Sequence, residues 1–121
     1  MAVIARYNPA AEFHTGEDCY ITELRNTADD PECSIARARV KPGVTTRLHW
    51  LERTSERYVI ISGNGEVTVG ADAATPVEAF DVVHIPAGVP QQISNTGSED
   101  LVFLCICTPR FCMDNYRALE D

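Results

Sequence analysis

The stretch that decides the fold reads GVTTRLHWLERTSERYVIISG and runs from Gly43 to Gly63. Apolar and polar residues alternate on both sides of its central ERTS turn, which is the pattern of two half-buried β-strands. A second stretch, DVVHIPAGVPQQISN from Asp81 to Asn95, has the same layout around a Pro-Ala-Gly turn. Each stretch therefore predicts a strand-turn-strand hairpin.

Around these two stretches, short apolar runs recur about every ten residues, which is typical of a sandwich or barrel. We expect strands at 19–24, 34–40, 47–51, 56–62, 66–69, 81–85, 91–94 and 101–107, with every proline in a connection. Residues 1–18 are expected to form a loose arm with an edge strand. Asp114 is a suitable N-cap for a short helix over residues 114–120. The chain is therefore predicted to be a single all-β domain spanning residues 1–121.

The composition narrows the function classes. Eighteen acidic residues outnumber ten basic ones, for a net charge of −8, and the basic residues include a single lysine, Lys41. A chain this acidic is not expected to bind nucleic acid or an anionic membrane surface. The first six residues hold too short an apolar run for a signal peptide, and no segment has the length of a membrane span. We therefore expect a cytoplasmic protein.

The five cysteines agree with a reducing compartment, because their number is odd and none belongs to a CxxC pair. Cys105 and Cys107 are two residues apart in an apolar run and so share one face of the predicted strand. They are interpreted as small buried hydrophobic residues.

Strand parity groups the polar residues of the two stretches, because alternate residues of a strand point to the same face. The expected hairpins place His49, Glu56 and Tyr58 on one wall of an apolar cavity, and Gln91 faces them from the second hairpin. The opposite register would bury Arg57 without a partner, which costs considerable free energy. His49, Glu56 and Tyr58 are therefore the candidate catalytic residues.

Three arginines are candidates for binding a substrate. Arg47 shares the face of His49, whereas Arg37 and Arg39 share one face of the strand predicted at 34–40. If that face is turned inward, Arg37 and Arg39 can anchor a carboxylate or phosphate, and if it is turned outward they are solvated charges.

The two stretches carry a family resemblance. The first resembles the first motif of the cupin superfamily, in the order Gly43-x5-His49-x-Leu51-x4-Glu56-x6-Gly63, with Leu51 at the place of a second histidine. The second resembles the second cupin motif, with Gln91 at the place of its metal-binding histidine and with Phe80 in place of its opening glycine. The resemblance covers about residues 34–107. It implies a double-stranded β-helix, or jelly-roll barrel, similar to small cupins called mannose-6-phosphate-isomerase-like.

The resemblance also implies a set of metal ligands. His49 and Glu56 match the first histidine and the glutamate of the family, and Gln91 can add an amide oxygen, a weaker ligand than imidazole. The ion implied is Zn, Mn, Ni or Fe, with no organic cofactor.

Three functions remain open. In the first, a divalent metal held by His49, Glu56 and Gln91 supports isomerase, cyclase or lyase chemistry on an oxygenated metabolite, with a dioxygenase as a subordinate version. In the second, no metal takes part: His49 is a general base, Glu56 orients it and Tyr58 is the acid, as in epimerases or dehydratases of the superfamily. In the third, the cavity binds a small ligand without chemistry. Because an open sandwich leaves edge strands, we expect a homodimer, with the N-terminal arm crossing to the partner.

Overall fold

The computed structural model describes residues 3–16 and 18–119. The described strands are β1 (Phe13–His14), β2 (Tyr20–Arg25), β3 (Ser34–Val40), β4 (His49–Leu51), β5 (Ser55–Ser62), β6 (Gly65–Val69), β7 (Thr75–Val77), β8 (Val82–Ile85), β9 (Gln91–Asn95), β10 (Leu101–Thr108) and β11 (Tyr116–Ala118). Two short 3-10 helices, η1 (Pro9–Ala11) and η2 (Met113–Asn115), accompany them. Among the described residues, no helix is long and apolar enough to cross a membrane.

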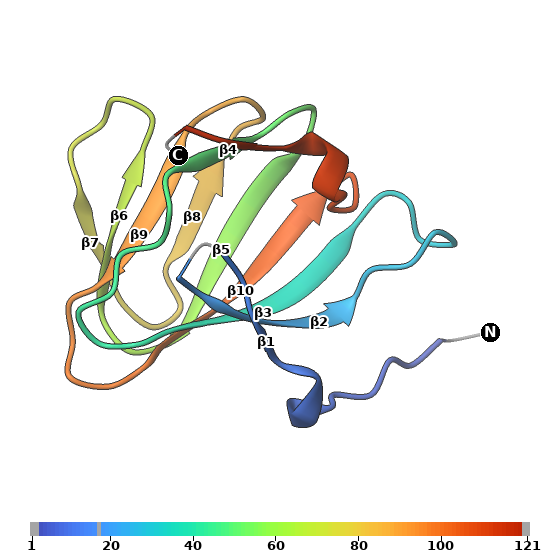
Figure 1. Ribbon diagram of the computed structural model, residues 1–121, viewed down its shortest axis with the longest axis horizontal. Helices are drawn as coiled ribbons and strands as arrows, with labels where there is room; N and C mark the ends of the chain where they lie inside the picture. The colour runs from blue at the N-terminus through green and yellow to red at the C-terminus, as the bar shows by residue number, and fades with distance from the viewer. Residues whose placement is uncertain (1–2, 17, 120–121) are drawn as a thin grey trace.

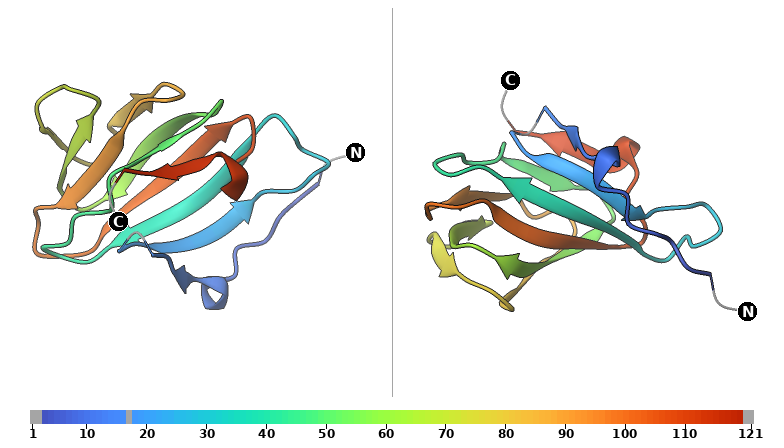
Figure 2. Two further views of the ribbon diagram at one scale, coloured as in Figure 1. Left: turned by 45° about the horizontal axis from the view of Figure 1, so that its top comes forward. Right: turned by 90° about the horizontal axis from the view of Figure 1, so that it is seen from below.

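The strands form two antiparallel sheets that face each other (Figures 1 and 2). One sheet has the order β1-β2-β3-β10-β5-β8, and the other has the order β11-β4-β9-β6-β7. Within the first sheet, β10 lies between β3 and β5, although it comes much later in the sequence. This all-β, double-stranded β-helix confirms the predicted fold class.

The two predicted hairpins are wrong. Strands β4 and β5 lie in different sheets, and so do β8 and β9, so the turn after each first strand carries the chain across the sandwich. The two stretches pair with each other instead: Glu56 on β5 lies opposite Ile85 on β8, and His49 on β4 lies opposite Gln91 on β9. The alternation of apolar and polar residues along a strand shows which side chains point inward. The same alternation occurs whether the next strand pairs with this one or lies in the facing sheet, so it does not reveal the pairing.

Two further predictions need correction. The C-terminal segment is η2 followed by β11, not a helix over 114–120, and β11 pairs with the open edge of β4. The predicted N-cap Asp114 lies inside η2. Pro76 lies within the unpredicted strand β7, where its missing N–H is tolerated because β7 is an edge strand that pairs with β6 alone. Residues 1, 2, 17 and 120 of the predicted arm and helix lie outside the described residues.

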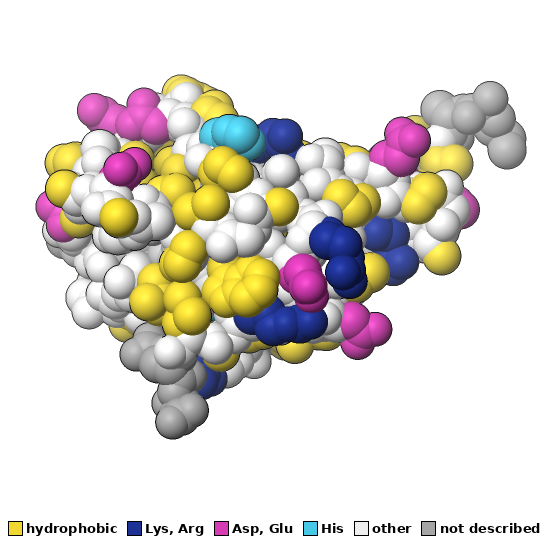
Figure 3. All heavy atoms as spheres, turned by 90° about the horizontal axis from the view of Figure 1, so that it is seen from above, with side chains coloured by type: hydrophobic (Ala, Val, Ile, Leu, Met, Phe, Trp, Pro, Cys, Tyr) yellow, Lys and Arg dark blue, Asp and Glu magenta, His cyan; other side chains and the backbone are white. Residues whose placement is uncertain are grey.

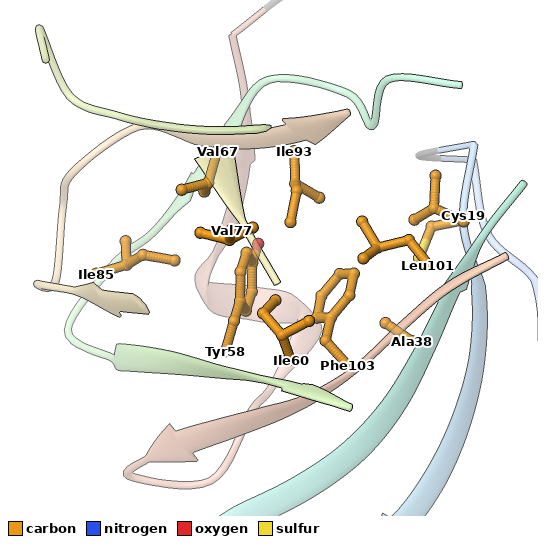
Figure 4. Close-up of a cluster of buried hydrophobic side chains, with 11 residues drawn as sticks. Cys19, Ala38, Tyr58, Ile60, Val67, Val77, Ile85, Ile93, Leu101 and Phe103 are labelled. Atoms are coloured by element: carbon orange, nitrogen blue, oxygen red, sulfur yellow. The ribbon is translucent and has the colours of Figure 1, made fainter. Parts of the chain in front are cut away.

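The apolar core fills the space between the sheets. Figure 4 shows Ile60, Ile85 and Phe103 from the larger sheet pointing toward Val67, Val77 and Ile93 from the smaller one. These side chains are almost fully buried. The core thus holds the sheets at one end of the sandwich and leaves the space beside Tyr58 and Phe103 for a cavity.

The N-terminal arm is fixed to the outer face of the larger sheet by an ion-pair cluster. Arg39 donates two hydrogen bonds to the Glu12 carboxylate, from Nη2 at 2.6 Å and from Nε at 3.0 Å. Its Nη1 donates to Asp100 at 3.1 Å. Arg37 lies 3.4 Å from the same Glu12 carboxylate. Strand β1, which follows Glu12 directly, is thereby held beside β2 at the sheet edge.

We expect this attachment to weaken in acid. The hydrogen bond from Arg39 and the charges of both arginines lower the pKa of Glu12 below its ordinary 4.5. A carboxyl with a lowered pKa stabilises the folded arm above about pH 4.5, and this contribution is lost as the pH falls through the lowered pKa. Amide hydrogen exchange of residues 11–14 should therefore speed up between pH 5 and pH 3, after correction for the intrinsic exchange rate. Glu12→Gln should exchange fast at both pH values, and an unchanged acid response in that variant would contradict the assignment to Glu12.

Candidate functional site

A cavity of about 150 Å³ lies between the two sheets. Its described lining includes His49, Glu56 and Tyr58, so the structure brings the three candidate catalytic residues to one space. They do not share one wall as expected: His49 comes from the smaller sheet, and Glu56 and Tyr58 come from the larger one. The site is therefore assembled across the sandwich.

Strand register arranges the larger sheet's wall in rows. One row crosses four strands and consists of Tyr58, Cys105, Ala36 and Glu23. The adjacent row consists of Glu56, Cys107 and Ser34. All of these side chains line the cavity, because rows two residues apart on paired strands point to the same face.

His49 is held in a defined orientation and tautomer. Its Nδ1 lies 2.9 Å from the backbone carbonyl oxygen of Arg47. A carbonyl can only accept a hydrogen bond, so Nδ1 carries a proton and Nε2 is the nitrogen that can gain or lose one. The ring also stacks on Tyr116 of β11, with centroids 5.0 Å apart and planes at 24°. Sequence analysis missed Tyr116 because the segment was assigned to a helix.

Glu56 lies next to two thiols on the wall. Burial, followed by the charge of Glu56, raises the pKa of Cys105 and of Cys107. Both thiols therefore stay protonated at neutral pH and are poor nucleophiles. Cys107 is buried as expected and Cys105 is partly buried, but sequence analysis missed that both line the cavity beside Glu56.

Gln91 is buried and has a structural partner. Its Oε1 accepts a hydrogen bond from the hydroxyl of Tyr58, which points from the larger sheet toward the smaller one (Figure 4). Gln91 is absent from the described residues that line the cavity. The amide oxygen of Gln91 thus joins the two sheets, and its role as a metal ligand stays a prediction.

The predicted arginine anchors lie elsewhere. Arg37 and Arg39 point to the outer face and pair with Glu12, while the alternate residues Ala36 and Ala38 line the cavity. The outward orientation therefore holds for both arginines. Arg47 contributes its carbonyl oxygen to His49, and its side chain is not part of the described lining.

Glu23 is a lining residue that sequence analysis missed. Burial raises the pKa of Glu23, against the opposing effects of a hydrogen bond from Asn26 and the positive charge of Arg110. Asn26 is itself anchored, because Arg110 Nε donates to its Oδ1 at 2.8 Å and its Nδ2 donates to the Phe111 carbonyl at 3.0 Å. Glu23 lies on the same face of β2 as Ile21 and is exposed, so it lines the rim of the cavity, and strand parity could have found it.

The residues of the cavity do not fit the metal site that the resemblance implies. Leu51 has no donor atom, and the oxygen of Gln91 is engaged by Tyr58. Within residues 3–16 and 18–119, no three His, Cys, Asp or Glu side chains are grouped so that they could hold one ion. His49 and Glu56 alone would have to bind it, from opposite walls.

The protein is thus a double-stranded β-helix with a cavity between its two sheets. The chain belongs to the cupin family, because the family model of the cupin domain matches residues 36–107. An uncharacterized protein of Methanocaldococcus jannaschii is 32% identical over 116 residues, which cover 94% of this chain and 92% of that protein.

Three solved structures share this fold. The nucleoside dehydratase Pac13 superposes with a TM-score of 0.78 and 18% identity, over 95% of this chain and 90% of that one. A Tyr-to-Phe variant of the Streptomyces protein, with uridine, is equally similar, with a TM-score of 0.79. A predicted oxalate decarboxylase of Thermotoga maritima gives 0.70 and 29% identity, over 75% of this chain and 80% of that one. The chain thus has enzymes among its structural neighbours.

Proposed function

We propose that this cupin is an enzyme that uses acid–base chemistry without a metal, of the lyase or isomerase kind, on a small oxygenated metabolite. The observation that carries the proposal is the fixed tautomer of His49, whose basic nitrogen belongs to a ring that lines a cavity faced by Glu56 and Tyr58. A histidine held in one tautomer and oriented by a backbone carbonyl is suited to general base catalysis.

In this proposal His49 removes a proton from carbon next to a carbonyl or similar activating group. The imidazolium that forms is stabilised by the carboxylate of Glu56 on the opposite wall. If the imidazolium returns the proton to a departing hydroxyl, the products are water and an unsaturated compound. If it returns the proton to a different carbon, the product is an isomer. In both reactions the proton that His49 removes is returned by His49, so no other proton donor or acceptor is needed.

Tyr58 is assigned a binding role in this scheme. Its hydroxyl donates to Gln91, so its proton is already committed, but the oxygen can still accept a hydrogen bond from a substrate hydroxyl. Support for a lyase comes from the nucleoside dehydratase, which shares this fold over nearly the whole chain. The homodimer stays a prediction, tested by analytical ultracentrifugation at micromolar concentration.

Chelation separates this proposal from a metal-dependent one. Once a screen of oxygenated metabolites has found a substrate, exhaustive treatment with EDTA or dipicolinate should leave kcat within about twofold of the untreated value, because no proton transfer depends on a metal. Elemental analysis of the same sample checks that metal was removed. Turnover that disappears on chelation and returns with one added ion would show that the metal-free mechanism is wrong.

A further inference from the structure

We infer that the cavity takes an uncharged or cationic ligand with several hydroxyl or amino groups, in preference to a phosphorylated or carboxylated one, and that Glu23 determines this specificity. The inference rests on the proposed function and names the substrate class of the same site.

The charges of the cavity wall disfavour an anionic ligand. Among the described residues that line the cavity, Glu23 and Glu56 are acidic and none is a lysine or arginine. Three arginines of the larger sheet have partners elsewhere: Arg39 and Arg37 bind Glu12, and Arg57 donates to the hydroxyl of Thr108 at 2.7 Å. A phosphate or carboxylate entering this space would lose hydration and meet the like charges of Glu23 and Glu56, and the positive charge of Arg110 near Glu23 already interacts with that carboxylate.

The position of Glu23 sets the length of a ligand that contacts both ends of the wall. Glu23 lies on β2 and Tyr58 on β5, at opposite ends of one row, with β3 and β10 between them. Three strand spacings separate their backbones by about 14 Å. A ligand that contacts both ends therefore needs polar groups at each of its own ends, and a small molecule such as a two-carbon acid is too short to do so.

The surroundings of Glu23 indicate which ligand groups it can bind. Asn26 and Arg110, themselves joined at 2.8 Å, oppose the effect of burial on the Glu23 carboxyl and lie beside it at the exposed rim of the cavity. An ionised carboxylate only accepts hydrogen bonds, and it can accept two at once from neighbouring hydroxyls or from an ammonium group. Glu23 is therefore suited to the diol of a sugar or to an amine.

The middle of the wall matches an apolar or flat portion of the ligand. Between the two polar ends lie Cys105 and Ala36, and the neighbouring row adds Ala38 and Phe103, so this part of the wall offers only the weak donor of one thiol. The two polar ends and this middle portion together describe a nucleoside or an unphosphorylated glycoside.

Matched pairs of ligands test the inference by isothermal titration calorimetry. Each pair differs by one phosphate: uridine with uridine 5′-monophosphate, adenosine with its monophosphate, and methyl mannoside with its 6-phosphate. We expect at least one uncharged member to bind at millimolar concentration or below, and to bind at least tenfold more tightly than its phosphorylated partner. Preferential binding of any phosphorylated member would overturn the inference, and so would the failure of every uncharged member to bind.

Glu23→Gln tests the residue, because it keeps the shape and removes the charge. We expect about tenfold weaker binding of the uncharged ligand, because a hydrogen bond to a charged acceptor is replaced by one to a neutral amide. The preference over the phosphorylated partner should shrink as well. Glu66→Gln, at an exposed position of β6, is the matched control and should change neither affinity. If Glu23→Gln does not fold, Glu23→Asp is the second variant. It keeps the charge but has a shorter side chain, so it should also weaken binding. Unchanged binding in a folded variant would show that Glu23 does not contact the ligand.

The calorimetry is independent of turnover. Binding of an uncharged ligand that is never converted, even slowly, contradicts the proposed enzyme but not the ligand class. Conversion of a phosphorylated ligand that depends on His49 and survives chelation contradicts the ligand class alone.

Discussion

Replacement of His49 by alanine is expected to lower kcat by at least a hundredfold without unfolding the protein. General base catalysis contributes about 10²–10⁴ to a rate, and in the proposed mechanism His49 both removes and returns the proton. Its ring also stacks on Tyr116, so thermal melting must be measured beside the kinetics. The folded variant should bind substrate with little change in affinity, because the lost interaction acts mainly in the transition state.

The chain offers a matched control in His84, which is exposed on β8. His84→Ala should keep the full kcat. In the wild-type protein, the rate should fall in acid as His49 becomes protonated, and this limb of the pH profile should be missing from the residual activity of His49→Ala. A His49→Ala variant that is folded and retains more than a tenth of the activity would exclude His49 as the base.

Replacement of Gly63 by alanine is expected to lower the free energy of unfolding by about 3 kcal/mol. Gly63 has a φ of +92°, and a Cβ there would come within 2.7 Å of the Asp100 carbonyl oxygen and 2.9 Å of the Leu101 Cα. Both neighbours are backbone atoms at the start of β10, so they can move only by disturbing the central strand of the larger sheet. Urea unfolding monitored by circular dichroism measures the loss.

Gly43 and Gly88 separate the two causes of this loss. Their φ values are +78° and +81°, but a Cβ at either position would meet nothing within 4 Å. Alanine at these positions should therefore cost only the backbone strain, about 1 kcal/mol each. Equal losses for Gly43→Ala and Gly63→Ala would show that the close approach of residues 100 and 101 contributes nothing.

Much of the site could be predicted from the sequence because alternation is a local property. The inward orientation of His49, Glu56 and Tyr58 follows from strand parity and holds in the structure. The pairing of the strands could not be obtained in the same way, because a turn that joins two neighbouring strands and one that crosses to the facing sheet have the same local pattern. For this reason the two stretches were predicted as hairpins, although they pair with each other.

The other features that the sequence did not reveal also depend on partners that are distant in sequence. The role of Gln91 depends on the hydroxyl of Tyr58, in the opposite sheet. The C-terminal segment becomes a strand because β4 has an open edge, and the N-cap signal of Asp114 does not compensate for those hydrogen bonds. Glu23 lies outside both motifs, so a search limited to the family pattern does not reach it.

The face seen from above in Figure 3 carries the C-terminal segment, with hydrophobic side chains gathered among scattered charged groups. Exposed Met113 and Leu119 belong to this segment, which also supplies Tyr116 to His49. Substitutions in residues 113–119 are therefore expected to affect the site as well as the surface.

The place of β10 has a consequence for how the protein is made. A ribosome releases both motifs before it releases residues 101–108, yet β3 and β5 have no direct pairing and need β10 between them. A nascent chain that ends at residue 100 therefore carries His49 and Glu56, but its larger sheet is divided and its cavity wall lacks Phe103, Cys105 and Cys107. The larger sheet can close only after residues 101–108 have been synthesised, and such dependence on distant segments makes folding slow. Until then, the unpaired edges of β3 and β5 are open to association with other chains, so chaperone binding during synthesis matters more here than it does for a chain folded from local contacts.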